Sequence, residues 1–396
     1  MRGKRFVAEH IRSVAVLFTL CCSLFAAGAF AQSSGSWEAS GYVSDMASGV
    51  MLHPDSAWMW ENVVHHRLNL GWQANEHWRV DAGMRNRLIV GDMAKQAGYA
   101  ESIGADRGWM DLSWNPAHGN GTILNATVDR LLVTFEKGRW NLQLGRQRIN
   151  WGQTLVWNPN DIFNTYSFFD VDYVERPGCD AFRGTYYHSE TASTELAVSP
   201  DGSGKVTAAM LHRWNRKNFD YQLAAGVYAQ SDLMLGGALS GDWHGLNLRG
   251  ELSYFRSIEN FADADGVVAA AVGIDYVFAN SLMLQTEALY NNVGNEAASQ
   301  GLSGLYAAPL SAKRLSVCKR SIFGQASYPV TPRLTSAASA MYFVEIRSFY
   351  AGLSFDCSVI ENLDCSFISQ YFAGAGRANP GNMQAWLGFI RVKYSF

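Results

Sequence analysis

The residues best suited to chemistry gather in one run, 145–178, which is the densest concentration of Trp, Asn, Asp and Arg in the chain. Opposed cations and carboxylates in a narrow space create a transverse electric field that sorts solutes by charge and dipole. Large aromatic rings offer surfaces on which sugars or aromatic solutes stack. The candidate residues, including one arginine just beyond the run, are Arg146, Arg148, Trp151, Trp157, Asp161, Asp170, Asp172, Glu175, Arg176 and Arg183.

The same charges have a second interpretation. Bidentate pairs between arginine and carboxylate can hold a loop to a wall without touching a solute, and one residue can serve both purposes. A solvated outer loop is the alternative for the whole segment, but rings such as Phe163 and Tyr173 need burial. A loop of more than about 20 residues also requires a reason in a compact fold. We therefore expect a pore-constricting loop at about 152–178.

A period of two residues dominates the segments around this run, and it is the period of a β-strand. In 78–90 the inward set of Arg79, Asp81, Arg85 and Arg87 alternates with apolar residues. In 386–396 apolar residues alternate with charged or polar ones in the same way. Charge at every second position opposite an apolar face is typical of a strand between a water-filled lumen and lipid.

The pattern predicts an all-β fold, a transmembrane antiparallel β-barrel of about 18 strands with both termini in the periplasm. Sixteen strands would remain if the weak segments 193–199 and 233–240 are not strands. The connection 91–125 is expected to be an outer loop with a short ordered piece around 109–112. The clearest alternating segments are 64–72, 78–90, 131–135, 139–148, 219–227, 246–254, 268–278, 282–290, 349–357 and 365–371.

The first 31 residues predict a cleaved signal peptide. A basic start, a short apolar stretch at 14–29 and an Ala-x-Ala site at 29–31 form the standard three-part pattern. Residues 32–396 then form a single barrel domain. Aromatic residues are 13% of the chain and charged residues only 17%, which is unlike a soluble enzyme. The formal charge of −3 does not suggest a nucleic-acid partner.

The chain carries no recognisable enzymatic or metal-binding motif. Gly-x-Ser-x-Gly, His-Glu-x-x-His, Cys-x-x-Cys and a phosphate-binding Walker loop are all missing from the sequence. His65 and His66 are adjacent, so only one of them faces a given side of a strand. We therefore expect no enzymatic activity, no cofactor and no metal site.

Four cysteines follow the predicted signal peptide, and an oxidising compartment permits disulfides. Cys357 and Cys365 are equidistant from a turn at 360–362, which predicts that they face each other across a hairpin. They form either a bridge or a pair of small apolar groups facing lipid. Cys179 and Cys318 fall near the predicted outer rim and are the second candidate pair.

Three motifs carry a family resemblance: Gly-Arg-Gln-Arg through Asn-Trp-Gly at 145–152, Trp-Asn-Pro-Asn-Asp at 157–161, and Tyr-x-Glu-Arg-Pro-Gly at 173–178. This region, about 142–187, resembles uncharacterised porin-like outer-membrane proteins. It is more distantly similar to alginate-export barrels, which have a comparable Gly-Arg-Gln strand. The resemblance implies an 18-stranded type of solute channel but no substrate. The chain departs from the alginate-export type by lacking a dense arginine lining for an anionic polymer.

We therefore expect a porin in the outer membrane of a Gram-negative bacterium, for passive or weakly selective diffusion of small hydrophilic solutes. The first alternative is a substrate-specific export channel for a polysaccharide or an organic acid. The second is a non-conducting structural or adhesive barrel, or a barrel-embedded hydrolase. The expected partners are outer-membrane lipid, small hydrophilic solutes and the barrel-assembly machinery through the C-terminal Phe396. The assembly is expected to be a monomer or a homotrimer.

Overall fold

The computed structural model of the chain describes residues 36–52, 56–169, 171, 177–294, 310–376 and 379–396. The predicted signal peptide and four candidate site residues, Asp170, Asp172, Glu175 and Arg176, lie outside these described residues. Within them, no helix is both long enough and apolar enough to cross a membrane.

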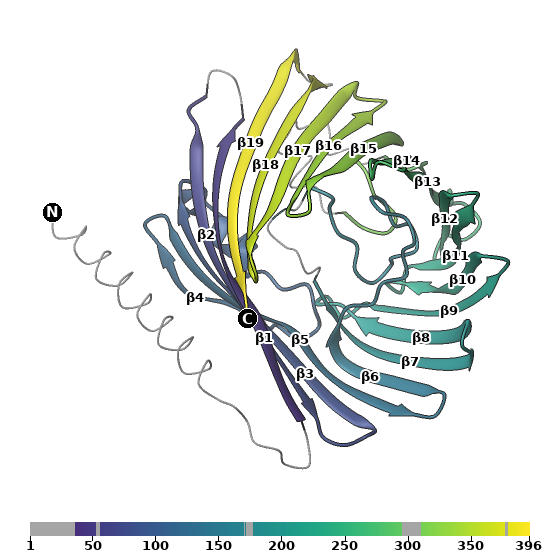
Figure 1. The fold of residues 1–396 in the computed structure, drawn as a ribbon. Coiled ribbons are helices and arrows are strands. Elements are labelled where there is room, and N and C mark those ends of the chain that lie inside the picture. Colours follow the sequence, from purple (N-terminus) through teal and green to yellow (C-terminus); the bar gives the residue numbers. More distant parts are fainter. Residues whose placement is uncertain (1–35, 53–55, 170, 172–176, 295–309, 377–378) are drawn as a thin grey trace.

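The described strands form one closed antiparallel β-barrel (Figure 1). All of the 19 strands except β4 belong to the closed ring, so the predicted count of about 18 is confirmed. The strand bounds are β1 Ser36–Met51, β2 Met59–Gln73, β3 Trp78–Gly91, β4 Ser113–Gly119, β5 Thr122–Lys137, β6 Trp140–Gln147, β7 Cys179–Ser189, β8 Ala192–Pro200, β9 Val206–Arg216, β10 Phe219–Tyr228, β11 Asp232–Trp243, β12 Leu246–Ser257, β13 Val267–Val277, β14 Met283–Asn291, β15 Arg320–Thr331, β16 Leu334–Phe343, β17 Ser348–Ile360, β18 Leu363–Gly376 and β19 Asn379–Ser395.

The first and last strands close the ring. β1 pairs with β19 from Tyr42 opposite Ser395 to Met51 opposite Trp386. The backbones of Gly41 and Phe396 exchange two hydrogen bonds of 2.9 Å, which extends this pairing to the last residue. Because every described strand of the ring has two neighbours, the ring has no free edge strand among the described residues.

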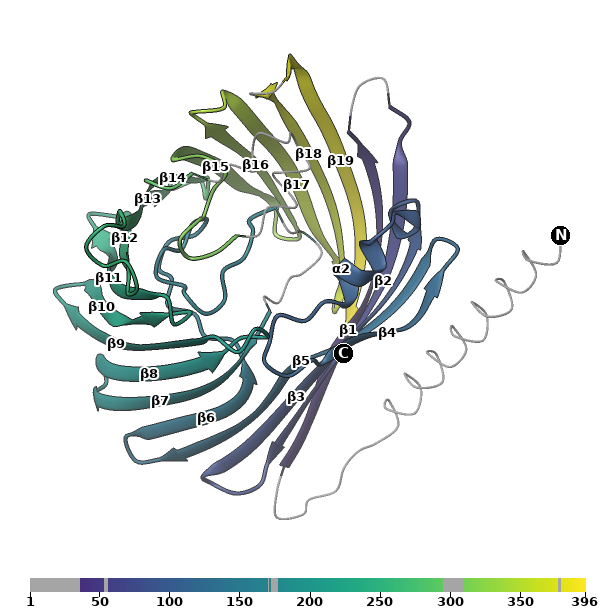
Figure 2. The ribbon, with the colours of Figure 1, turned by 180° about the vertical axis from the view of Figure 1, so that it is seen from behind.

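The connection between β3 and β5 is ordered and only partly outside. It contains the short helices η1 (Met93–Lys95) and α2 (Tyr99–Gly104), followed by β4. α2 packs against the inward-facing Val63, Ile89 and Ile123, so it covers part of the lumen from within (Figure 2). β4 pairs with the start of β5, whereas β6 pairs only with the end of β5, from Leu131 to Lys137.

The two faces of the wall follow the alternation of the sequence. On β19, Trp386, Ile390 and Val392 point outward and are 43%, 59% and 41% exposed. Directly after Val392, Lys393 points inward and lies 3.5 Å from Asp364. The lumen takes the polar side chains because water or an ion partner is available there, whereas lipid offers neither.

Aromatic side chains gather at the short-turn end of the outer surface. The rings of Trp37 and Trp72 stack with 5.6 Å between their centroids. Trp78 and Phe135 lie 4.8 Å apart, and similar contacts continue around the wall. Such a girdle marks the level of lipid headgroups, so this rim lies at one interface of a membrane.

The four cysteines are free thiols in the structure. Cys357 and Cys365 are direct partners in the pairing of β17 with β18, as the turn spacing predicts. Both share the outward face with Phe355 and Phe367. In this structure they are therefore a pair of small apolar groups on the lipid-facing side. Cys318 packs in an apolar cluster on the far side of the lumen from the cluster that includes Cys179, so this pair is not brought together.

The assignment of the outward face can be tested at Val272 of β13, which is 60% exposed. Val272→Arg should lower the free energy of unfolding in phospholipid vesicles by about 2–4 kcal/mol, since lipid cannot solvate the guanidinium. Gln325→Arg on the inward face of β15 is the control and should have a much smaller effect. Equal destabilisation by both substitutions, measured by denaturant titration, would contradict the assignment.

Candidate functional site

The segment between β6 and β7 lies inside the barrel over residues 148–169 (Figure 1). We call this segment the inward loop. Ile149 and Trp151 have no exposed surface, and Trp157, Asp161 and Ile162 are at most 5% exposed. A loop this deeply buried must find partners for its backbone groups without strand pairing.

Two glutamates on the wall supply many of these partners. Glu251 of β12 accepts hydrogen bonds from the backbone amides of Gln153, Thr154 and Asn160, and from the hydroxyl of Thr154 at 2.8 Å. Its exposed fraction is only 4%. Charge-assisted bonds of this kind are short and strong, so the carboxylate fixes both ends of the 153–160 turn.

Glu287 of β14 holds the middle of the same turn. Its two carboxylate oxygens accept from the backbone amides of Leu155, Val156 and Trp157 at 2.7–3.2 Å. Glu287 is 2% exposed, and a buried carboxylate is tolerable only when several donors surround it. The two glutamates therefore bind the inward loop to the wall opposite its origin.

The start of the inward loop is held by a third carboxylate, Glu195 of β8, which is 1% exposed. It accepts a 2.5 Å bond from the indole nitrogen of Trp151. Arg183 lies 2.6 Å and Arg213 3.4 Å from its second oxygen, so two guanidinium groups share one carboxylate. The arginine side chains are 24% and 30% exposed and thus reach the space beside the loop.

The end of the inward loop is held by aromatic contacts. The ring of Phe168 lies 5.0 Å from that of Phe323 on β15, and the ring of Phe169 lies 5.1 Å from Tyr350 and 5.3 Å from Phe372. These wall residues face the lumen, yet they are apolar and buried in one cluster. This side of the barrel interior is therefore a packed hydrophobic core rather than an open water path.

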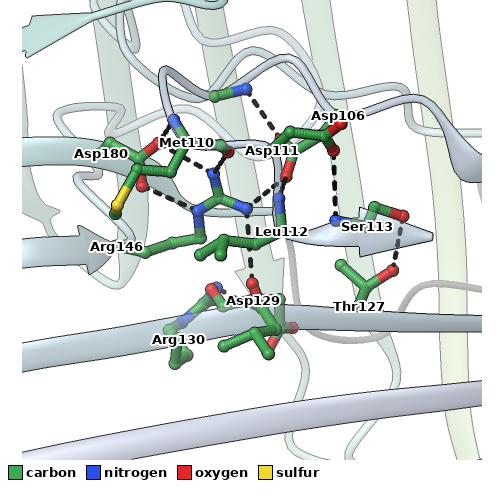
Figure 3. Close-up of polar contacts among 12 residues, drawn as sticks. Asp106, Met110, Asp111, Leu112, Ser113, Thr127, Asp129, Arg130, Arg146 and Asp180 are labelled. Atoms are coloured by element: carbon green, nitrogen blue, oxygen red, sulfur yellow. Dashed lines mark hydrogen bonds and ion pairs between the residues drawn. The ribbon is translucent and has the colours of Figure 1, made fainter.

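Arg146 of β6 connects the start of β7 with the 105–112 segment (Figure 3). Its guanidinium forms a bidentate pair with Asp180 at 2.8 Å, and it lies 2.5 Å from Asp106. It also donates to the backbone oxygen of Met110 at 2.5 Å, and it is 3% exposed. These bonds tie the 105–112 segment to the wall where β6 is too short to cover β5.

A cavity of about 960 Å³ lies beside the inward loop. It is bounded by β3 and β5, by the 102–108 segment, by the start of β7 and by residues 162–167 of the loop. Its lining contains Arg85, Arg87 and Arg107 together with Asp129 and several hydroxyl groups. A space of this size holds water and small polar molecules.

Comparison with solved structures shows what kind of barrel this is. OccK5 (OpdH) of Pseudomonas aeruginosa aligns over 91% of this chain and 98% of its own, with a TM-score of 0.60 and 10% identity. The outer membrane channel DcaP of Acinetobacter baumannii aligns over 93% and 100%, with a TM-score of 0.51 and 12% identity. The fold is porin-like. No family model and no curated protein sequence matches the chain.

The porin-like barrel places the predicted site residues in different surroundings. Arg146 is paired with Asp106 and Asp180, and Arg183 with Glu195. These three carboxylates lie outside the predicted set. The other described candidates are the inward-facing Arg79, Arg85 and Arg87, the half-buried Arg148, and Asp161, which is 1% exposed.

The two tryptophans of the candidate set need a correction. Trp151 and Trp157 are 0% and 5% exposed, so their rings do not offer stacking surfaces to a solute. Trp151 packs edge-on to Phe163 at 5.0 Å, and Trp157 belongs to the cluster of the apolar side. Burial of these rings supplies the apolar contacts that hold the loop inside a polar lumen.

Sequence reasoning missed the wall residues that position the loop, above all Glu195, Glu251 and Glu287. It also missed a second inward segment at 310–318, in which Lys313 lies 2.8 Å from Asp232. The available signal was a single carboxylate at an inward position of an otherwise apolar or small-residue strand, as at Glu195 within 192–200. A buried lone charge predicts a partner, but not which segment supplies it.

The ion pairs of Arg146 with Asp106 and Asp180 predict that the stability of the 105–112 segment depends on pH. Burial would raise the pKa of Asp106, but hydrogen bonds from Arg146 and from the amides of Gly108 and Leu112 hold this pKa below its ordinary value of 3.8. The stabilisation is therefore complete above pH 3.8 and is lost as the pH falls below it. Hydrogen exchange of 105–112, corrected for intrinsic rates, should stay slow at pH 4.5 and accelerate below pH 3.8.

Asp106→Asn is the matched control for this experiment. Its exchange should be faster at every pH, with no acid-induced step, because the amide carries no titrating charge. A step of equal size in this variant would assign the transition to another group.

Proposed function

We propose that this porin-like barrel is an outer-membrane channel for passive, weakly selective diffusion of small hydrophilic solutes. The observation that carries the proposal is the cavity of about 960 Å³, lined by charged and hydroxyl groups, beside a loop fixed within the lumen. A loop that narrows a lumen without filling it is the arrangement expected of a solute filter. The similarity in fold to the outer membrane channel DcaP supports the same function.

The proposed path follows the polar side of the lumen. The side formed by β15 to β18 is occupied by the packed aromatic rings around Phe168 and Phe169. Opposite it, the cavity adjoins Arg85 and Arg87, and the partly exposed Arg183 and Arg213 lie beside the start of the inward loop. Solutes would therefore meet mainly guanidinium, carboxylate and hydroxyl groups, and the aromatic residues of the cavity are Phe163, Tyr166 and Tyr228.

A non-conducting adhesive barrel is the competing function, and it predicts a filled lumen. The cavity argues against it. Export of a strongly anionic polymer is also disfavoured, because arginines of the wall such as Arg67 and Arg146 are engaged with carboxylates at 2.5–2.8 Å. A polymer would have to compete with these pairs at each step.

Release of the inward loop tests the filter. Glu251→Ala with Glu287→Ala removes the acceptors of the 153–160 amides, and deletion of 158–168 removes much of the loop. Both changes should raise single-channel conductance in planar bilayers, by roughly twofold or more, since conductance follows the open cross-section. Glu345→Ala, at an exposed outer loop, is the control and should leave conductance unchanged.

Two results would contradict this proposal. Absence of single-channel current from the unmodified protein at high protein load would show that the barrel does not conduct. Unchanged conductance in both loop variants, with the fold verified by heat-modifiable migration, would show that the loop is not the constriction.

The charge preference of the channel is set, in this proposal, by Arg183 and Arg213, which share a single carboxylate and leave an excess positive charge. Arg213→Glu should lower the chloride-to-potassium permeability ratio by roughly twofold or more. Reversal potentials across a salt gradient measure this ratio. Arg320→Glu, at the exposed rim, is the control and should leave it nearly unchanged. Liposome swelling with sugars, amino acids and organic acids would then rank the solutes.

A further inference from the structure

Two imidazoles share one hydroxyl group on the outer surface of β7, β8 and β9, near the short-turn end. Nε2 of His188 lies 2.7 Å and Nδ1 of His212 lies 3.0 Å from the hydroxyl oxygen of Thr194. The two imidazole rings are also in edge-to-face contact, with 5.6 Å between their centroids. We call His188, Thr194 and His212 the histidine cluster.

The shared hydroxyl determines how the two imidazoles use their protons. A threonine hydroxyl has one proton, so it donates to one imidazole and accepts from the other. When both rings are neutral, the remaining nitrogens, Nδ1 of His188 and Nε2 of His212, are therefore one donor and one acceptor. One proton added to the accepting nitrogen makes both of them donors. Two neighbouring donors on an outer surface suit the oxygens of an anion.

The histidine cluster is part of the aromatic girdle. The Tyr186 ring lies 4.7 Å from the Trp140 ring and 5.0 Å from that of His188, and the Trp214 ring stacks on His212 at 5.5 Å. Since the girdle marks the level of lipid headgroups, the imidazoles lie at that level too. The groups that surround them in a membrane are therefore glycerol and phosphate as well as hydrocarbon.

Four exposed cations gather at the two short turns on either side of the cluster. Lys137 and Arg139 lie at the turn between β5 and β6, and Arg216 and Lys217 lie at the turn between β9 and β10. Within the described part of the chain none of the four is in an ion pair. The backbone oxygen of Arg139 accepts a hydrogen bond from the amide of Tyr187 at 2.9 Å, which places Arg139 beside the end of β7.

Acidic side chains do not balance these cations on the outer surface. Glu136 and Asp220 occupy inward positions, where Asn141 and Asn215 donate to them. Glu190, in the turn between β7 and β8, is then a single carboxylate against four cations. The other described short turns, 74–77, 244–245, 278–282, 332–333 and 361–362, together contain one Lys or Arg residue, Arg333. The positive charge of this rim is therefore concentrated around the cluster.

An apolar surface continues from the cluster toward the membrane interior. Phe182, Leu196 and Met210 lie on the outward faces of β7, β8 and β9 and are 40%, 47% and 51% exposed. Leu196 and Met210 are direct partners in the strand register. A molecule with an anionic head and an apolar chain can contact the imidazoles and these side chains at the same time.

We propose that the histidine cluster, together with Arg139 and Arg216, binds the phosphodiester group of an anionic phospholipid in the inner leaflet of the outer membrane. In the orientation expected for this barrel the short turns face the periplasm, so the phosphates of that leaflet lie at this girdle. Phosphatidylglycerol fits the charge of the site, because its headgroup lacks the ammonium group that arginines would repel. This inference concerns the lipid around the barrel and does not depend on the proposed transport function.

Retention of phosphatidylglycerol tests the site. The protein is titrated with phosphatidylglycerol or phosphatidylethanolamine in mild detergent, and native mass spectrometry of the complexes gives Kd. His188→Phe with His212→Phe keeps both rings in the girdle but removes their nitrogens, and should raise the Kd for phosphatidylglycerol by roughly fivefold or more. Arg139→Gln with Arg216→Gln should raise it by roughly tenfold and weaken its dependence on salt concentration.

Arg333→Gln with His77→Phe is the matched control, since it removes the same kinds of groups from two other short turns. It should leave the Kd unchanged. Heat-modifiable migration verifies the fold, and single replacements at the exposed His188 and Arg216 serve where a double variant does not fold. The proposal fails if phosphatidylethanolamine binds as tightly as phosphatidylglycerol, if the site variants bind as tightly as the control, or if soluble glycerol phosphate displaces the lipid at equal concentration.

Discussion

The arrangement of this lumen depends on two buried carboxylates, Glu251 and Glu287, and on the backbone amides that surround them. A carboxylate removed from water needs several donors, and the amides of a loop without strand pairing need acceptors. The two carboxylates accept the hydrogen bonds that the amides of the loop donate. Hydrogen bonds to a charged acceptor contribute about 1.5–3 kcal/mol each, so moving the loop would leave both partners unsatisfied at considerable cost.

This anchoring makes the interior asymmetric. The start of the inward loop is bound by Glu195 of β8, its middle by glutamates of β12 and β14, and its end by the aromatic residues of β15 to β18. Its apolar side chains, such as Phe169, pack against that wall and exclude water from it. The charged residues of β3, β7 and β9 are then left as the lining of the remaining space. A single loop thus both narrows the lumen and determines which wall a solute meets.

The sequence predicted the barrel well because the relevant signals are local. Alternation assigns each side chain to a face, and short turns set the register of neighbouring strands, as at Cys357 and Cys365. The partners of buried charged groups, in hydrogen bonds as in ion pairs, are not local. Leu155 and Glu287 are 132 residues apart, and Arg146 pairs with Asp106, 40 residues before it, and with Asp180, 34 residues after it. Such pairs depend on which strands face each other across the closed ring, which periodicity does not encode.

The alternation of apolar outward and polar inward residues has an exception on β1 and β2. It places Asp45 and His66 on the outward face as firmly as it places Ile390 there, although hydrocarbon suits only the last of these. The neighbouring strands β2 and β3 carry Arg67 and Arg85 on their inward face, where Arg67 lies 2.7 Å from Asp129. Packing that fixes the outward face of a strand also restricts its inward side chains, because a β-wall is one layer thick.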